Sequence, residues 1–181
     1  MGGSRDAYFL KTSRLGFRTW TENDLPLALS LWANPQVTRF IGGPFSAEAV
    51  RHRLASEIAC ASVHGVQYWP IFQLSNGEFV GAGGLRPYKP AEHIYELGIH
   101  LLPEQWGQGL AQEAARGIIE FAFTTVGAKS LFAGHHPENA ASKRLLEKLG
   151  FAFTHRELYA PTGLEHPSYL LMAPAKSQSA K

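Results

Sequence analysis

A predicted strand, a glycine loop and a predicted helix follow one another between residues 94 and 126, and this arrangement constrains the fold more than any other stretch. The strand ends at Leu102-Pro103, and the loop carries Gly107 and Gly109, which reach positive φ angles at little cost. Apolar residues then recur with helical spacing: Ala111, Ala114, Ala115, Ile118, Ile119, Ala122 and Val126. A glycine loop before a helix directs backbone N–H groups and the positive end of the helix dipole at one spot. The stretch therefore predicts a phosphate-binding site.

The loop sequence argues against two common nucleotide-binding motifs. It contains no lysine, and the chain has no Gly-x-x-x-x-Gly-Lys, which disfavours an ATP-binding P-loop. Gln112 stands where the dinucleotide-binding fingerprint requires Gly or Ala. The two glycines alone fit a plain tight turn before a core helix equally well, so a second feature is needed to decide.

A segment downstream supplies that feature. Residues 137–151 form a predicted capped helix that ends at Gly150. Together with the loop, this segment resembles the GNAT superfamily of N-acetyltransferases, in particular the branch that includes the RimJ and RimL enzymes. The first family motif corresponds to Trp106-Gly107-Gln108-Gly109-Leu110-Ala111-Gln112-Glu113-Ala114, and the second runs from Asn139 through Ser142 to Gly150-Phe151. The resemblance extends from about residue 14 to residue 172.

The order of predicted elements indicates the fold class. Early strands pair as a hairpin through Asn76-Gly77, and a later strand–helix–strand crossover implies a parallel pair. We expect an α/β (α+β) fold with a mixed, mostly antiparallel sheet and helices on both faces; the family implies that the parallel pair is splayed. Strands are expected at residues 15–19, 67–74, 78–85, 94–102, 130–134, 151–159 and 168–172, with a loop at 86–92, and helices are expected to follow Thr21, Ser46, the glycine loop and Asn139.

The resemblance implies that acetyl-CoA is the co-substrate. Its pantetheine arm would lie in the splay and pair with the main chain of Ile99, His100 and Leu101, as an added strand would. The diphosphate would meet the backbone of the loop, namely Trp106, Gly107, Gln108, Gly109, Leu110, Ala111 and Gln112. In the second motif, Asn139 is expected as a helix N-cap or a pantetheine partner, Ser142 as a further contact, and Lys143 as a surface charge within reach of a phosphate.

Direct transfer to a primary amine requires a group that takes a proton from the amine. Strand alternation places Glu96, Gly98, His100 and Leu102 on one face, and Glu96 is the first candidate for the base. A salt-bridged sheet residue is an equally good interpretation of Glu96. His100 lies about 13 Å from Glu96 along the strand, so it is a second base or a lining residue rather than half of a dyad.

The proton donor for the leaving thiolate is less clear from the sequence. Many GNAT enzymes carry a Tyr near the position of Leu146, and this chain lacks it. The RimJ and RimL branch suggests Ser142 as the substitute, although a CoA contact or a place in the first helical turn explains Ser142 equally well. Trp106 also differs from the Gln or Arg of the broader superfamily. The side chains of Tyr68, Trp69, His166 and Tyr169 are acceptor-pocket candidates by position only.

Composition agrees with one globular domain over residues 1–181, with an ordered core at about 14–172 and flexible ends at 1–8 and 176–181. Apolar residues make up 45% of the chain, and the net charge of +2 gives no reason to expect nucleic acid. We find no membrane-length apolar run and no signal peptide, and Cys60 is the single cysteine, so a cytoplasmic protein is expected. No metal is expected, because His135 and His136 would point to opposite sides of an extended chain.

The class of acceptor stays open in the sequence. It is a protein N-terminus, a lysine, an amino-acid-like metabolite or an aminoglycoside-type amine. A homodimer is also compatible with the chain. An alternative class is an acyl-CoA-binding sensor or partner-binding module without catalysis. A third option is an acyl group longer than acetyl, with room for it at Gly81, Gly83 and Gly84.

Overall fold

A single mixed sheet organises residues 8–175, which are the residues described by this computed structural model. The strand order is β1-β2-β3-β4-β5-β6-β8-β7, and all neighbours are antiparallel except β5 and β6. The strands are β1 (Leu10–Lys11), β2 (Leu15–Phe17), β3 (Tyr68–Gln73), β4 (Phe79–Lys89), β5 (Ile94–Leu101), β6 (Ser130–Gly134), β7 (Ala152–Tyr159) and β8 (Leu164–Met172).

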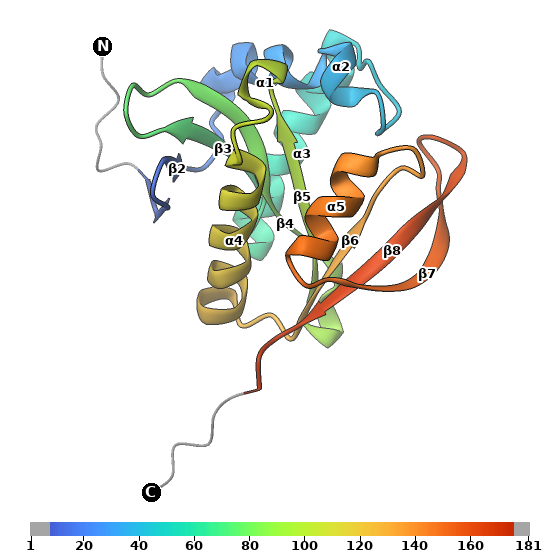
Figure 1. The fold of residues 1–181 in the computed structure, drawn as a ribbon. Coiled ribbons are helices and arrows are strands. Elements are labelled where there is room, and N and C mark those ends of the chain that lie inside the picture. Colours follow the sequence, from blue (N-terminus) through green and yellow to red (C-terminus); the bar gives the residue numbers. More distant parts are fainter. Residues whose placement is uncertain (1–7, 176–181) are drawn as a thin grey trace, which may run out of the picture.

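Helices cover both faces of the sheet. They are α1 (Leu25–Trp32), α2 (Pro35–Thr38), α3 (Ala47–His64), α4 (Leu110–Phe121) and α5 (Ala140–Lys148). In the view of Figure 1, α4 and α5 lie in front of the sheet and α3 lies behind it. One buried cluster joins Leu97 and Leu101 of β5 to Ile118 of α4, and a second joins Tyr68 of β3 to Trp32 of α1. The expected fold class, with helices on both faces, is confirmed.

Helix boundaries follow the capping residues seen in the sequence. The Ser46 hydroxyl accepts a hydrogen bond from the Ala49 N–H at 3.1 Å at the start of α3, and Gly65 ends that helix with a φ of 70°. The Asn139 side-chain oxygen accepts from the Ser142 N–H at 3.0 Å at the start of α5. The predicted N-caps at Ser46 and Asn139 are therefore confirmed.

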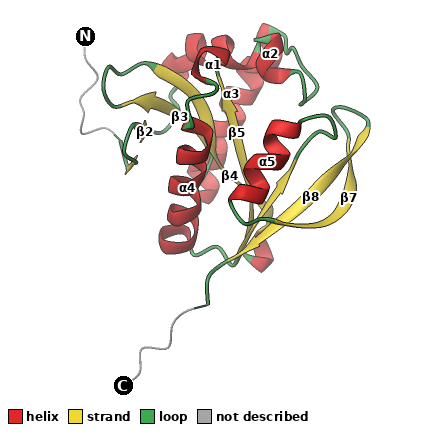
Figure 2. Ribbon diagram, in the orientation of Figure 1, coloured by secondary structure: helices red, strands yellow, loops and turns green. Residues whose placement is uncertain are grey.

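The parallel strands β5 and β6 separate after a short paired stretch. They pair only from Ile94 opposite Ser130 to Glu96 opposite Phe132, although β5 continues to Leu101 and β6 to Gly134. Figure 2 shows the two strands diverging from this point. The expected splay is present, and it leaves one edge of β5 without a neighbouring strand.

Three elements differ from the sequence-based expectation. Residues 86–89 are not a loop: β4 continues to Lys89 because it pairs with β5 up to Lys89 opposite Ile94. The last strand, β8, begins at Leu164 rather than near residue 168, and β1 lies before the expected core. All three differences come from pairing with a neighbouring strand, which supplies hydrogen-bond partners to backbone N–H and C=O groups. Local sequence patterns do not reveal such partners.

Most of the ends that we expected to be flexible, residues 1–7 and 176–181, lie outside the described residues. Between residues 8 and 175, the structure contains no helix with both the length and the apolarity needed to cross a membrane.

Candidate functional site

The glycine loop has the backbone shape that the sequence predicted. Gly107 and Gly109 have φ angles of 74° and 75°, and α4 begins directly afterwards at Leu110. The Trp106 indole N–H donates to the Leu101 carbonyl at 2.9 Å, while half of the Trp106 side chain remains exposed. The loop is therefore fastened to the end of β5, and its amides lie at the N-terminus of α4.

Arg14 and Glu113 hold the loop from the side. The Arg14 guanidinium donates to the Gln108 carbonyl at 3.0 Å and to the Glu113 carboxylate at 2.6 Å, and the Arg14 N–H donates to Glu113 at 2.7 Å. Thr12 also donates to Glu113 at 2.6 Å. Burial raises the pKa of Glu113, but the bonds from Thr12 and Arg14 outweigh it and hold the pKa below its usual value. The sequence gives no signal of this cluster, because its members are about 100 residues apart.

The free edge of β5 carries backbone groups of alternate residues. The Leu102 N–H donates to the Val80 carbonyl at 3.0 Å, so residues of the same parity, including His100, direct their backbone groups toward β4. Ile99 and Leu101 therefore direct theirs to the side where β6 has diverged. The Leu101 carbonyl is used by Trp106, which leaves Ile99 as the centre of the open edge.

The second motif is arranged around the start of α5. The Asn139 side-chain oxygen and the Ser142 N–H are joined in the helix cap, and Ser142 lies in the first turn. Lys143 is exposed and lies 3.8 Å from Glu147 on the same helix. Leu146 is buried in the core, so an acid at the position of the family's tyrosine is absent here.

The face of β5 that carries Glu96 and His100 lies against α1 and α3 rather than against α4. Glu96 stands directly opposite Arg86 in the antiparallel β4–β5 ladder, which places both side chains on this face. Tyr68 crosses it over Gly98, where any Cβ would overlap the Tyr68 ring. The predicted alternation of β5 agrees with this arrangement, since Leu97 and Leu101 pack in the opposite core.

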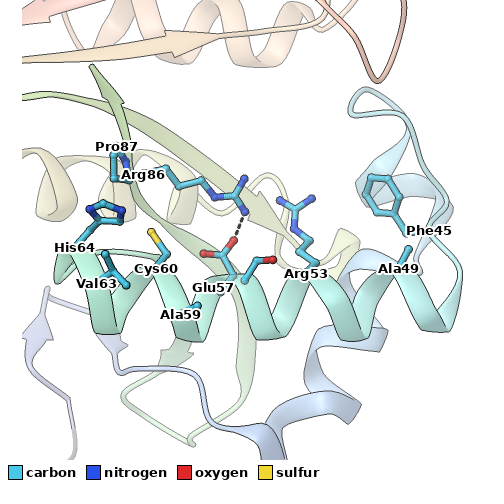
Figure 3. A pocket seen from close by; sticks show the side chains of 11 residues that line it. Phe45, Ala49, Arg53, Glu57, Ala59, Cys60, Val63, His64, Arg86 and Pro87 are labelled. Atoms are coloured by element: carbon cyan, nitrogen blue, oxygen red, sulfur yellow. Dashed lines mark hydrogen bonds and ion pairs between the residues drawn. The ribbon is translucent and has the colours of Figure 1, made fainter. Parts of the chain in front are cut away.

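Arg86 pairs with a carboxylate that the sequence did not single out. Its guanidinium bonds to the fully buried carboxylate of Glu57 on α3, as Figure 3 shows. Glu57 also accepts the Tyr68 N–H at 2.9 Å, and the Arg86 guanidinium lies 4.1 Å from the Tyr68 ring centre. This cluster of Glu57, Arg86 and Tyr68 joins α3 to the sheet.

Glu96 has no ion-pair partner within residues 8–175, so the salt-bridged interpretation of Glu96 does not hold there. Burial raises the pKa of Glu96, Arg86 opposes the shift, and the nearby Glu157 carboxylate adds to it. A carboxylate with a raised pKa is a better proton acceptor at neutral pH than an ordinary one.

His100 is held as a neutral imidazole. Burial, together with the positive charges of Arg53 and Arg86, holds the pKa of His100 well below its usual value. The Trp32 indole N–H donates to His100 Nδ1 at 3.2 Å, which places the imidazole proton on Nε2. His100 therefore lines the site with a hydrogen-bond donor on Nε2.

An open groove of about 770 Å³ lies beside this face (Figure 3). It runs along α3, and its lining residues are Phe45, Ala49, Arg53, Ser56, Glu57, Ala59, Cys60, Val63, His64, Arg86 and Pro87. Burial raises the pKa of Cys60, so its thiol is not activated. The groove is lined mainly by apolar side chains with two guanidinium groups among them.

Other candidates from the sequence have structural positions. Trp69 and Tyr169 belong to the buried core that includes α4, whereas Tyr68 lies on the site face. His166 bonds to the Thr162 hydroxyl at 2.9 Å near the β7–β8 turn. Within residues 8–175, no group of three or more His, Cys, Asp or Glu side chains is arranged to hold a metal ion.

The glycines of β4 lie close to the neighbouring strands. A Cβ at Gly81 would overlap the His100 carbonyl, and one at Gly84 would overlap the Gln67 carbonyl. A Cβ at Gly83 would lie 3.1 Å from the Ile99 side chain. These glycines therefore allow close approach of neighbouring strands, as the sequence also suggested, and room for a longer acyl group stays a prediction.

The chain is similar to known proteins, both in a family pattern and over most of its length. The sequence pattern of the Acetyltransferase (GNAT) domain family matches residues 14–152. The uncharacterized N-acetyltransferase YoaA of Bacillus subtilis is 27% identical over 146 residues, covering 78% of this chain and 81% of that protein. The FsC-acetyl coenzyme A-N(2)-transacetylase of Aspergillus fumigatus is 28% identical over 172 residues, covering 86% and 72%.

Solved structures share the fold at low sequence identity. A GNAT-family acetyltransferase from Bacillus anthracis superimposes with a TM-score of 0.79 at 22% identity, covering 91% of this chain and 98% of that chain. The ribosomal L7/L12 α-N-protein acetyltransferase RimL gives 0.78 at 15% identity, covering 95% and 98%. Spermidine N-acetyltransferase from Vibrio cholerae, solved with CoA and spermine, gives 0.75 at 16%, covering 89% and 96%.

Proposed function

Because this chain belongs to the GNAT acetyltransferase family, we propose that it transfers an acetyl group from acetyl-CoA directly to a primary amine. The observation that carries the proposal is the double use of β5. Its open backbone edge at Ile99 faces the splay, and its Glu96 side chain stands across from Arg86, whose side chain lines the groove beside α3. The acyl donor and the amine acceptor can therefore approach the same strand from two directions.

The residues present fit a CoA thioester. The open edge offers the Ile99 N–H and carbonyl to an amide chain, in the way that sheets accept an added strand. The loop from Trp106 to Gln112 offers amides at the N-terminus of α4, which favours a diphosphate. We propose that Asn139, Ser142 and Lys143 contribute further contacts from the start of α5. When bound, acetyl-CoA would supply the activated acyl carbon.

Glu96 is the proposed base. An amine attacks a thioester only when neutral, and an alkylammonium group is mostly protonated near pH 7. The Glu96 carboxylate accepts the ammonium proton before the nitrogen attacks. As the nitrogen–carbon bond forms and the carbon–sulfur bond breaks, the nitrogen loses a second proton and the departing thiolate gains one. His100, with its Nε2 proton, orients groups in the same site. No covalent bond to the protein is needed.

Ser142 is the proposed proton donor to the departing thiolate, as the RimJ and RimL branch suggests. The support is its place in the first turn of α5 and the absence of a tyrosine at Leu146.

The RimJ/RimL-like assignment itself is supported by the two motifs and by the fold shared with RimL. The lone cysteine, Cys60, permits no internal disulfide and supports the cytoplasm as the expected compartment.

The acceptor is a primary amine of a protein N-terminus or a small molecule. The similar proteins include a ribosomal-protein and a spermidine acetyltransferase, so their names support an amine but not one class of amine. The alternative, a CoA-binding sensor without catalysis, is favoured by one observation, which is the missing tyrosine at Leu146.

The deciding experiment measures thiol release from acetyl-CoA with a panel of N-terminal peptides, polyamines, amino acids and aminoglycosides. Binding of CoA is measured in parallel by calorimetry for the wild type, Glu96→Gln and Ser142→Ala. Turnover with at least one amine, greatly reduced in Glu96→Gln at unchanged CoA affinity, supports the transferase and its base. Tight CoA binding without turnover across the panel supports the sensor.

A further inference from the structure

Arg53 is a cation in the groove that forms no ion pair with an acidic side chain of residues 8–175. We propose that Arg53 binds a carboxylate of the acceptor, so that the acceptor is an amine with a carboxylate close to its amino group. This inference rests on the proposed function and narrows its substrate class.

The hydrogen bonding of Arg53 is incomplete. Its Nε atom is buried and has no hydrogen-bond partner in the described part of the chain, so that atom is closed to a ligand as well. Leaving a charged donor unpaired is costly, and an arginine presents five donors in a fork that matches a carboxylate. Because the Arg53 side chain lines the groove, its terminal nitrogens are the donors that a ligand carboxylate can reach.

Aromatic rings fix Arg53 in place, although no ion pair holds it within residues 8–175. The guanidinium lies 4.5 Å from the Trp32 ring centre and 5.8 Å from that of Phe45. These aromatic faces hold the side chain in one position and leave its edge available for hydrogen bonds. Trp32 is itself fixed by its bond to His100, so Arg53 is tied to the same face as the proposed base.

Arg53 differs from Arg86 in its bonding. In Figure 3 the two side chains project from opposite walls of the groove with their guanidinium groups near each other, but only Arg86 reaches Glu57. Burial lowers the pKa of Arg53 most, the charge of Arg86 lowers it further, and the charge of Glu57 opposes the shift. A carboxylate bound at Arg53 would add a second negative charge beside the two cations.

Glu96 stands directly opposite Arg86 in the β4–β5 ladder, and the Arg86 side chain lines the groove together with Arg53. Neither Glu96 nor Arg53 forms an ion pair within residues 8–175. Burial raises the pKa of Glu96, and the charges of Arg86 and Arg53 oppose the shift. A zwitterionic ligand such as an α-amino acid would direct its amino group toward Glu96 and its carboxylate toward Arg53.

The test measures binding, so it does not depend on turnover. Calorimetry on the full chain saturated with CoA compares L-methionine, L-phenylalanine and L-threonine with their α-carboxamides. We expect the acids to bind about tenfold more tightly or better, since the carboxamide lacks the negative charge and the second acceptor oxygen of a bidentate pair with arginine. A second arm compares the dipeptide amides Asp-Ala-NH2 and Asn-Ala-NH2, which place a carboxylate on a peptide N-terminus instead.

Variants assign the preference to Arg53. Arg53→Gln should bring the acid-to-carboxamide ratio close to one, and Arg53→Lys should retain part of it. Arg51→Gln, which removes an exposed arginine two residues earlier on α3, should leave the ratio unchanged. Thermal unfolding and CoA affinity identify any variant that fails to fold, and Arg53→Met then replaces it.

Three outcomes overturn the inference: no acid binds in either arm, the wild-type ratio is near one, or the preference survives in Arg53→Gln. Thiol release is measured separately and tests the proposed function. If amines are turned over but acids bind no more tightly than carboxamides, the role of Arg53 is rejected and the transferase function stands. If acids bind more tightly and Arg53→Gln removes that preference, but no thiol is released, the transferase function is rejected and the role of Arg53 stands.

Discussion

Arg86 stands directly opposite Glu96 in the β4–β5 ladder, but its guanidinium bonds to Glu57 on α3 instead. Arg86 is therefore not available to Glu96, and the Glu96 carboxylate has no ion pair in the described part of the chain. The same bond fixes α3 against the sheet. A buried pair that is structural thus sets the chemical state of the residue next to it.

Glu96→Gln should lower kcat by about 10²- to 10⁴-fold, the usual contribution of a positioned base. Because burial raises the pKa of Glu96, the wild-type rate should rise with pH until this carboxyl is fully deprotonated, at a higher pH than for an exposed glutamate. The measurement is a pH profile of thiol release, with CoA affinity as the control. An unchanged profile in Glu96→Gln would assign the base to another group.

Glu57→Ala should lower the free energy of unfolding by about 3 kcal/mol or more, because it leaves the Arg86 guanidinium and the Tyr68 N–H without their partner. Glu57→Gln should cost less, since an amide oxygen can still accept the Tyr68 N–H. Urea unfolding of both variants measures the difference. Equal stability of Glu57→Ala and the wild type would show that the pair contributes nothing.

Gly109→Ala should weaken CoA binding, since a φ of 75° is strained for alanine by about 1 to 2 kcal/mol. Gly127→Ala is a matched control, with a φ of 76°, no neighbour within 4 Å of the added Cβ and a position outside the loop. Both variants should lose similar stability in thermal unfolding. Only Gly109→Ala should lose CoA affinity, and a parallel loss in Gly127→Ala would mean that the effect is global.

Arg14→Gln should raise the dissociation constant of CoA by about tenfold with little effect on stability. The Arg14–Glu113 pair is half-exposed on the arginine side and contributes less than about 1 kcal/mol to folding, but the bond to the Gln108 carbonyl shapes the loop. Calorimetry and urea unfolding separate the two effects. A loss of stability without a loss of affinity would contradict this role.

His100 should make stability depend on pH in the acidic range. Burial with Arg53 and Arg86 holds its pKa well below the usual value, so the unfolded chain takes up a proton below about pH 6.5 while the native chain does not. Stability should therefore fall as the pH drops, by at most about 1.4 kcal/mol per pH unit. Unfolding of wild type and His100→Gln between pH 7 and 5 tests this, and parallel curves would contradict it.

Local features of the fold were predictable from the sequence because short-range interactions determine them. The caps at Ser46 and Asn139, the Asn76-Gly77 turn and the alternation of β5 all depend on residues within a few positions of one another. The crossover through α4 implied the parallel pair in the same way.

Long-range partners could not be predicted in this way. Glu57 has the sequence context of an ordinary helix residue, and only the fold brings it to Arg86, 29 positions away. The same holds for Arg14 and Glu113, which are 99 positions apart, and for Arg53, whose stacking on Trp32 joins two helices. Tertiary pairing also decided that residues 86–89 are strand, since β5 offered them a partner.

The alternation of β5 limits how this strand can change in length. Its side chains and its backbone groups both repeat every two residues, so an insertion of a single residue after Glu96 reverses both patterns downstream. The Ile99 backbone would then turn toward β4 and the His100 side chain toward α4. Such an insertion would change, in one step, the residues at the free edge and the side chains on the face that carries Glu96, whereas substitutions alter them one at a time.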